Sequence, residues 1–379
     1  MRGSYPKGEP GVRYSRIKRM MGEQGLDAIV LYSPQWKPEV VHHASNLRLL
    51  GEDACVVLPR SGEPCLLTCQ EWDINRIREE CWIEEIIVCH CNIMQKAAQI
   101  AAHHGKNVGI VGVEHMTAVK YMAFEKELAG KNIKNVYAEF DEMCKVKTKW
   151  EVEIMRRCAK LADLAYMVEM DSLRPGVSEY EVIAEMERAM KEGGADENFQ
   201  LIGMGRNLPS MSRAKENYLK MGDLVLTEIT PVIGSITYAT QLCRTVKMGE
   251  ATPLEREKHG LLVTALEYAL GKMKAGIRAK DVAIWQNEII GAAGYEEYCH
   301  PPHMRSRGHN FGLGYIDLAE DNEEILKTDT VLVIHPNQMI PEIGYLACGL
   351  TVRITDDGIE RLSNLSPQMF EAASASTMG

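Results

Sequence analysis

Gly-Asp-Leu-Val-Leu-Thr-Glu, residues 222–228, is one of four short stretches that decide the fold of this chain. The others are Gln-Leu-Cys-Arg-Thr at 241–245, Arg-Gly-His-Asn-Phe-Gly at 307–312 and Ile-His-Pro-Asn at 334–337. His309 lies in a Gly-bounded segment, and His335 follows the apolar run 331–334. Because a strand end of this kind can aim a side chain into a site, the stretches predict a strand-built site in the C-terminal part of the chain.

Taken together, these stretches resemble the superfamily of creatinase, prolidase, aminopeptidase P and methionine aminopeptidase, whose catalytic domain has the pita-bread fold. The resemblance implies an α/β N-terminal creatinase-like domain over residues 1–143 and an α+β pita-bread catalytic domain over residues 144–379. It covers nearly the whole chain. In the metal-dependent members of this superfamily, five side chains hold two metal ions.

The resemblance places those five ligands at Glu228, Gln241, His309, His335 and Gly349. Gln241 is neutral, His335 stands where relatives have a glutamate, and Gly349 has no side chain to offer. One carboxylate, Glu228, remains. Because several carboxylates are needed to offset the repulsion between two close divalent ions, we expect no dinuclear metal site and favour no cofactor.

Glu228, His309 and His335 are the candidate catalytic residues. If they converge as their family counterparts do, they form a two-His, one-carboxylate set for a single divalent transition metal such as Fe, Zn or Mn. Without metal, the same trio offers a glutamate that orients and activates a proton-transfer imidazole. Creatinase has this fold and no metal, and the metal-free form is the one we expect.

Two more positions depart from the peptidase relatives. Ser212 and Ile316 stand where those relatives have histidines for peptide recognition or proton transfer. The leading hypothesis is therefore a hydrolase or lyase that cleaves a C–N or similar bond of a small carboxylate-bearing substrate. The alternatives are an Xaa-Pro dipeptidase with an atypical single-metal site and a catalytically inactive binding protein.

Cationic side chains precede His309. A Pro-Pro pair is flanked and followed by His300, His303, Arg305 and Arg307, which predict a rim suited to a carboxylate or phosphate on a small substrate, with Arg305 as the carboxylate anchor. Gln241, Cys243 and Cys348 are expected to line the same cavity. Cys243 is either a nucleophile activated by a nearby histidine or, more commonly, a buried core thiol.

The N-terminal segment 40–48 resembles a family segment that reaches toward the partner's active site in dimeric relatives. His43 and Arg48 are therefore candidates for substrate contacts across a homodimer. Further along, Cys65, Cys69 and Cys89-His90-Cys91 lack the spacing of a zinc knuckle, and we expect most cysteines to be reduced.

Bulk properties exclude some classes of protein. The chain has 379 residues, a net charge of −10 and a pI near 5.7, which argues against nucleic acid or an anionic membrane as a partner. It contains no apolar stretch of the roughly 18 residues that a membrane helix requires, and its start lacks a signal-peptide core. We therefore expect a cytoplasmic protein.

Periodicity predicts the elements of both domains. The N-terminal domain is expected to hold a helix at 12–21 and strands at 28–32, 54–59, 64–68, 86–89 and 108–112. A long helix is expected at 149–171, ended by Pro175 and Gly176. Ser178-Glu179-Tyr180-Glu181 predicts a capping box that opens a second helix.

Overall fold

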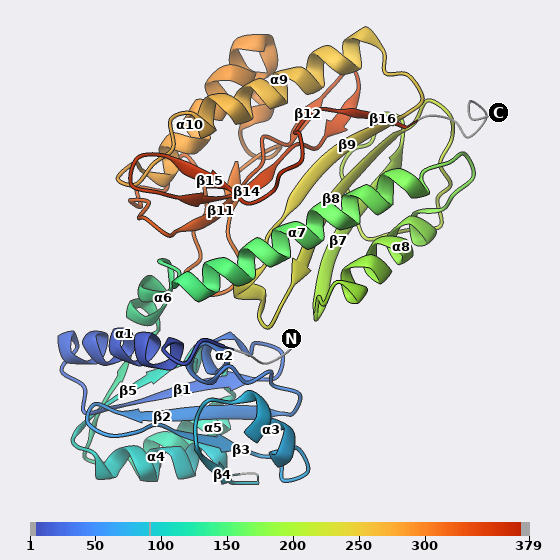
Figure 1. Ribbon diagram of the computed structural model, residues 1–379. Helices are drawn as coiled ribbons and strands as arrows, with labels where there is room; N and C mark the ends of the chain where they lie inside the picture. Colours follow the sequence, from blue (N-terminus) through green and yellow to red (C-terminus); the bar gives the residue numbers. More distant parts are fainter. Residues whose placement is uncertain (1–4, 91, 373–379) are drawn as a thin grey trace. The chain divides into compact units, whose positions relative to one another are not determined.

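The computed structural model describes residues 5–90 and 92–372 and divides into two compact units (Figure 1). The first unit contains the described residues up to Lys145 together with the short segments 234–237 and 312–314, and the second contains the rest. The predicted boundary at residue 143 lies inside α6 (Tyr137–Cys144). No helix in the described ranges is long and apolar enough to cross a membrane.

The first unit is built on a six-stranded mixed sheet in the order β4-β3-β2-β1-β5-β6. The central strands β1 and β2 are antiparallel, whereas β1 and β5 are parallel. All five strands predicted for this domain are present, and β6 is additional. The bounds are β1 (Ala28–Pro34), β2 (Asp53–Pro59), β3 (Cys65–Thr68), β4 (Glu85–Val88), β5 (Asn107–Val111) and β6 (Asn132–Asn135).

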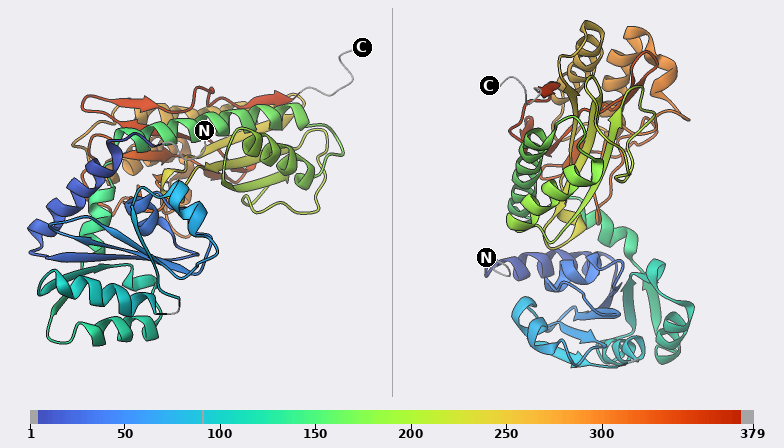
Figure 2. Two further views of the ribbon diagram at one scale, coloured as in Figure 1. Left: turned by 60° about the horizontal axis from the view of Figure 1, so that its bottom comes forward. Right: turned by 90° about the vertical axis from the view of Figure 1, so that its right-hand side faces the viewer.

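Helices cover both faces of this sheet because alternate residues of β1 point to opposite sides. Ile29 and Leu31 pack on one face with residues of α1 and α2. Ala28 and Val30 pack on the other face with residues of α4 and α5 (Figures 1 and 2). The helices are α1 (Glu9–Glu23), α2 (Glu39–Ser45), α3 (Ile74–Glu80), α4 (Ile93–His103), η1 (Val113–His115) and α5 (Ala118–Glu127).

The second unit contains two four-stranded sheets, ordered β16-β9-β8-β7 and β10-β11-β14-β15, and the hairpin β12-β13. A bridge between Cys243 and Gly349 joins the two sheets. The strands are β7 (Glu197–Gly205), β8 (Leu224–Val232), β9 (Leu242–Met248), β10 (Gly308–His309), β11 (Val331–Ile334), β12 (Gln338–Ile340), β13 (Gly344–Leu346), β14 (Leu350–Ile354), β15 (Ile359–Arg361) and β16 (Phe370–Ala372).

Long helices flank these strands, with α7 and α8 on one side and α9 and α10 on the other (Figure 1). The predicted long helix is α7, and the predicted capping box at Ser178 and Glu181 opens α8. A second capping box, Thr148 with Glu151, opens α7. The helices are α7 (Lys149–Ser172), α8 (Glu179–Glu192), η2 (Ile236–Tyr238), α9 (Pro253–Leu270), α10 (Ala279–Ile290), η3 (Gly291–Tyr295) and η4 (Glu296–Cys299).

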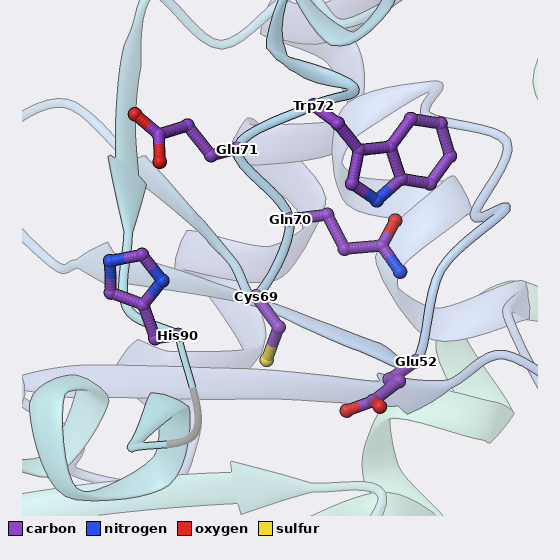
Figure 3. Close-up of a pocket in the computed structure, with 6 residues that line it drawn as sticks. All are labelled: Glu52, Cys69, Gln70, Glu71, Trp72 and His90. Atoms are coloured by element: carbon purple, nitrogen blue, oxygen red, sulfur yellow. The ribbon is translucent and has the colours of Figure 1, made fainter.

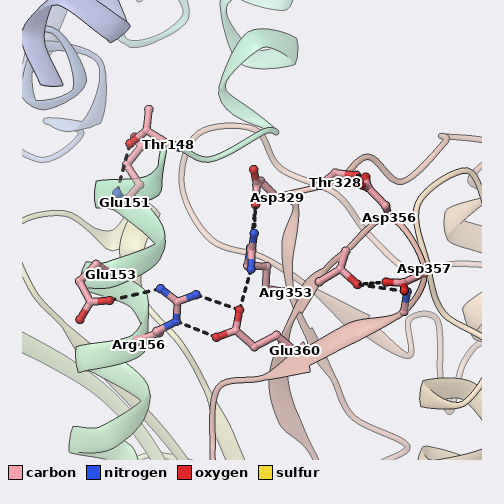
Figure 4. Close-up of polar contacts among 12 residues, drawn as sticks. Thr148, Glu151, Glu153, Arg156, Thr328, Asp329, Arg353, Asp356, Asp357 and Glu360 are labelled. Carbon is pink, nitrogen blue, oxygen red and sulfur yellow. Dashed lines mark hydrogen bonds and ion pairs between the residues drawn. The ribbon is translucent and has the colours of Figure 1, made fainter. Parts of the chain in front are cut away.

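An ionic network ties α7 to the second sheet (Figure 4). Arg156 of α7 donates two hydrogen bonds of 2.7 and 2.9 Å to the carboxylate of Glu360 on β15. Arg353 of β14 donates to Glu360 at 2.8 Å and to Asp329 at 2.7 Å. The hydrogen bonds from Arg156 and Arg353 lower the pKa of Glu360 to about 2.

Candidate active site

The candidate residues come from both sheets of the second unit. Glu228 lies in the middle of β8, where it pairs with Leu201 of β7 and Cys243 of β9. His309 lies on β10 opposite Val333 of β11. His335 follows the end of β11, as the sequence predicted. The fold therefore carries Glu228 on one sheet and both histidines on the other.

The two histidines form a pair. Their ring centroids are 5.2 Å apart and the ring planes meet at 70°. Nδ1 of His309 lies 3.1 Å from the backbone oxygen of Asn310. Because a carbonyl oxygen only accepts, this bond places the proton on Nδ1 and leaves Nε2 as the acceptor of the neutral ring. Burial lowers the pKa of His309, so the neutral ring dominates at neutral pH.

His335 is the more constrained of the pair. Its side chain keeps some solvent contact, but its Nδ1 atom is buried and has no hydrogen-bond partner among the described residues. Burial, together with the nearby His309, lowers the pKa of His335 to about 3. Burial of a ring nitrogen without a hydrogen-bond partner lowers the stability of the folded state, so this ring position is unfavourable by itself.

Glu228 belongs to a separate cluster. The side-chain nitrogen of Asn337 donates a hydrogen bond of 2.9 Å to Oε1 of Glu228. Burial raises the pKa of Glu228, and the groups that act against this shift are the uncharged side chains of Asn337 and Cys243. Burial raises the pKa of the Tyr345 hydroxyl on β13, and the nearby Glu228 raises it further. Glu228 is thus a largely buried carboxyl in uncharged surroundings.

Gln241, Cys243 and Cys348 are buried close to one another in the second unit. The Gln241 amide donates to Oγ1 of Thr230 at 3.1 Å, and its oxygen lies 3.6 Å from the sulfur of Cys243. Burial raises the pKa of Cys243 well above its ordinary value and that of Cys348 to about 12. Because the thiolate is the nucleophile, Cys243 has the environment of a core thiol rather than a reactive one.

The prediction of an exposed cationic rim is wrong for Arg307 and incomplete for Arg305. The side chain of Arg307 is buried, with 1% of it exposed, and it donates to Asn287, to the backbone oxygen of Asn337 and to Gln338 at 2.6–2.8 Å. Arg305 is 67% exposed and lies 3.6 Å from Asp317 and 3.7 Å from Asp321. Arg307 therefore supports the fold, and acidic neighbours offset the charge of Arg305.

The two histidines of the rim also have partners. His300 lies 2.9 Å from Glu296 and 3.6 Å from Glu320. The exposed ring of His303 lies against Tyr298, with centroids 4.9 Å apart. Of the three rim residues that are not fully buried, His303 is therefore the one without an acidic partner among the contacts described.

The N-terminal candidates lie inside the first unit. His43 is 3% exposed; its ring packs edge-on against Phe140, and Arg13 donates to its backbone oxygen at 2.9 Å. Arg48 donates to Glu80 at 2.9 Å. This placement does not suit His43 to the expected contact with a partner's substrate, because its side chain belongs to the core of its own unit.

A surface pocket of about 700 Å³ lies in the first unit (Figure 3). Cys69 and His90, two members of the cysteine-rich group, line it with Glu52, Gln70, Glu71 and Trp72. Cys91 lies outside the described residues. Among the residues described, no group of three His, Cys, Asp or Glu side chains could hold a metal ion.

The family's pair of metal ions does not fit this donor set. The five family positions provide one carboxyl, one amide, two imidazoles and one glycine. In the described ranges, Glu228, His309 and His335 are not grouped as a three-ligand site, and the alternative of a single ion held by them stays a prediction. One carboxyl cannot offset the charge of two close divalent ions.

Sequence reasoning missed two residues of this site. Asn337 donates a hydrogen bond to Glu228, and Tyr345 lies near the same carboxyl. The sequence could have pointed to Asn337, because this residue stands where the family's Glu-Pro-Gly turn has its glycine. Tyr345 had no signal, because the β12-β13 hairpin that carries it was not predicted. Ile316, at a family histidine position, is buried in the apolar core.

Comparison with known proteins agrees with this architecture. Residues 153–359, more than half the chain, match metallopeptidase family M24. Residues 13–144 match the creatinase/prolidase N-terminal domain. An Xaa-Pro dipeptidase of Pyrococcus furiosus is 26% identical over 368 residues, which cover 94% of this chain and 99% of that protein.

Solved structures show the same fold. An X-Pro aminopeptidase from Thermotoga maritima superposes with a TM-score of 0.81 at 19% identity, covering 94% of this chain and 99% of that one. A prolidase from Pyrococcus horikoshii OT3 gives 0.80 at 24% identity with the same coverage. The predicted superfamily, fold class and hydrolase assignment are confirmed: the chain belongs to metallopeptidase family M24, a hydrolase family, and has a creatinase/prolidase N-terminal domain.

Proposed function

We propose that this protein is an amide hydrolase that cleaves short peptides, with Xaa-Pro dipeptides as the first substrate class. The observation that carries this proposal is the full-length likeness to an Xaa-Pro dipeptidase, which covers 94% of this chain and 99% of the relative. This reverses the order of the two enzymatic hypotheses drawn from the sequence. The likeness favours a peptide substrate over another small carboxylate.

Within this proposal, His309 handles the proton. Its Nδ1 is directed to the Asn310 carbonyl, so Nε2 is available to accept a proton from water. That water adds to the substrate carbonyl carbon, and the same imidazole then gives the proton to the leaving nitrogen as the C–N bond breaks. His335 supports the ring of His309 by edge-on contact, and Glu228 orients the substrate or the water.

A second candidate retains the metal-free, creatinase-like chemistry on a small carboxylate-bearing amide. The observation that favours it is the loss of the peptidase histidines, since Ile316 is buried in the core and Ser212 bonds locally to the Arg213 carbonyl at 3.0 Å. The exposed Arg305 and His303 are the proposed carboxylate contacts in either case. A single divalent ion held by an altered site is the alternative for an Xaa-Pro dipeptidase.

The test is hydrolysis of a panel of Xaa-Pro dipeptides and of small N-substituted amides that carry a carboxylate, followed by liquid chromatography. We expect release of proline, and a loss of about 10²-fold or more in His309→Ala. His104→Ala, a change of an exposed histidine at the end of α4, is the matched control. A folded protein that turns over neither class would support the inactive binding protein instead.

Assembly and location are part of the same proposal. We propose a homodimer, on the resemblance to dimeric relatives, and a cytoplasmic location, as expected from the sequence. Light scattering coupled to size-exclusion chromatography tests the first, and a mass of one chain would contradict it.

A further inference from the structure

We propose that Cys69 and Cys89 form an oxidation-sensitive pair, which closes to a disulfide on exposure to a hydroperoxide and so fixes the edge strand of the first sheet. The pair lies in the first unit, at the pocket drawn in Figure 3, and does not depend on the proposed peptidase activity. Its basis is the register of the two cysteines, the face of the sheet that they share and their partial exposure.

The two cysteines follow neighbouring strands. β3 and β4 are parallel, and Thr68 and Val88 are their last paired residues. One residue further, the backbone nitrogen of Cys89 still donates to the Thr68 oxygen at 2.9 Å. Cys69 and Cys89 are therefore next to each other in register. Because neighbouring strands lie about 4.8 Å apart, the pair falls within the Cα–Cα range of about 4.4–6.8 Å that a disulfide requires.

Both side chains lie on one face of the sheet. They pack against the cluster that α4 and α5 cover, which also contains Cys55 and Cys65. Cys55 pairs with Leu67 and is thus diagonal to Cys69. Diagonal neighbours in a sheet are about 7–8 Å apart, which is too far for a disulfide. Among the described cysteines of this face, Cys89 is therefore the partner within reach of Cys69.

Both thiols are free and partly exposed, so a small oxidant can reach them. Cys69 lines the pocket of about 700 Å³ together with His90, the residue after Cys89 (Figure 3). The sulfur of Cys89 lies 3.8 Å from the backbone oxygen of Ile87, so closure requires rotation about its Cα–Cβ bond. Because a thiol is a weak hydrogen-bond donor, this contact does not hold the side chain firmly.

Charged groups around Cys69 keep its thiol protonated at neutral pH. Burial raises the pKa of Cys69 to about 11, the carboxylates of Asp53 and Glu52 raise it further, and Lys120 of α5 acts against them. A protonated thiol is a poor nucleophile. Cys69 is therefore suited to the second step of the oxidation and not to the first.

Cys89 is the thiol that reacts first. Burial raises its pKa, and the ammonium group of Lys96 on α4 acts against that shift. The Cys89 thiolate attacks one peroxide oxygen, the O–O bond breaks, and a sulfenic acid forms while water or an alcohol leaves. The Cys69 thiol then attacks the oxidised sulfur, the S–S bond forms and a second water leaves. The two sulfurs lose two electrons in total, which the peroxide takes up.

Peroxide treatment followed by mass spectrometry tests the pair. Every protein in the series carries Cys91→Ser, because Cys91 lies outside the described residues and is close to Cys89 in the chain. After hydrogen peroxide, iodoacetamide and digestion without reductant, we expect a peptide pair joined through Cys69 and Cys89, which dithiothreitol separates. Cys69→Ser and Cys89→Ser should each lose this pair, whereas Cys55→Ala, the matched control on the same face, should keep it. Full alkylation of both thiols after peroxide, or a bond to Cys55, would overturn the proposal.

Rate and stability give two further readouts. The rate of disulfide formation should rise about tenfold per pH unit above neutral pH, because the thiolate fraction of Cys89 does so below its pKa. The oxidised protein should unfold about 3–8 °C above the same sample after dithiothreitol, because the bond ties the edge strand β4 to β3. A rate that does not change with pH would overturn the attack by the Cys89 thiolate. An unchanged Tm in the cross-linked protein would overturn the fixing of β4.

Discussion

The side-chain amide of Asn337 joins Glu228 to the backbone of Cys348 by two hydrogen bonds, each 2.9 Å long. Because a backbone N–H only donates, the amide oxygen must face Cys348 and the amide nitrogen must face Glu228. A neutral side chain thus holds the one family carboxyl that this chain keeps. The contact joins Glu228, which keeps the carboxyl of the family position, to Asn337, which the sequence did not predict as a site residue.

Removal of this bridge should weaken the fold. We expect Asn337→Ala to lower the free energy of unfolding by about 1–3 kcal/mol, because Glu228 and the Cys348 nitrogen lose their partner inside the protein. Urea denaturation followed by circular dichroism measures the change. Asn364→Ala, at an exposed position, is the control and should change little. An equal loss in both variants would show that the bridge is not stabilising.

The two arginines that flank Ser306 should behave differently. Arg307→Met should lower the free energy of unfolding by about 3 kcal/mol or more, because it leaves several buried polar partners unsatisfied. Arg305→Met, at an exposed position, should stay within about 0.5 kcal/mol. In the peptidase assay, Arg305→Met should instead raise KM if Arg305 contacts a substrate carboxylate. An unchanged KM would remove that role.

The network around Glu360 should stabilise the second unit in a pH-dependent way. The folded-state pKa of Glu360 is lowered to about 2, so its contribution is present above its ordinary pKa and is lost as pH falls toward 2. Glu360→Gln should cost about 1 kcal/mol at pH 7, since the pairs are partly exposed. The difference from wild type should shrink below pH 4 in acid titrations of stability. A difference that grows in acid would contradict this assignment.

Cysteine labelling should separate buried from accessible thiols. Cys243 and Cys348 are fully buried with raised pKa values, so they should resist iodoacetamide in the native protein and react after unfolding. Cys69 lines the surface pocket and should react faster than either. Mass spectrometry of the digested protein gives the order. Rapid native labelling of Cys243 would reopen its role as a nucleophile.

The sequence predicted the fold well where a local pattern was sufficient. Alternation and apolar runs located the first five strands, and the capping residues located the start of α8. The same reasoning placed His335 at a strand end. These features depend on residues close together in the chain, which is why they could be read without the structure.

Contacts between distant segments could not be read in this way. Arg307 was expected in an exposed rim, but its partners Asn287 and Gln338 come from α10 and β12. The close approach of Gly349 to Ile334 and to the Cα and Cβ of residue 335 likewise depends on the register of two strands that the sequence did not define. Spacing identifies the changed positions, whereas the contacts around them become visible only in the structure.

The most direct test of the account is hydrolysis of an Xaa-Pro dipeptide by protein stripped with EDTA and 1,10-phenanthroline, with metal content measured on the same sample. The account predicts that proline release continues in metal-free protein and disappears in His309→Ala. Loss of activity on stripping, with recovery when Mn²⁺ or Co²⁺ is added back, would contradict it and restore a metal-dependent peptidase.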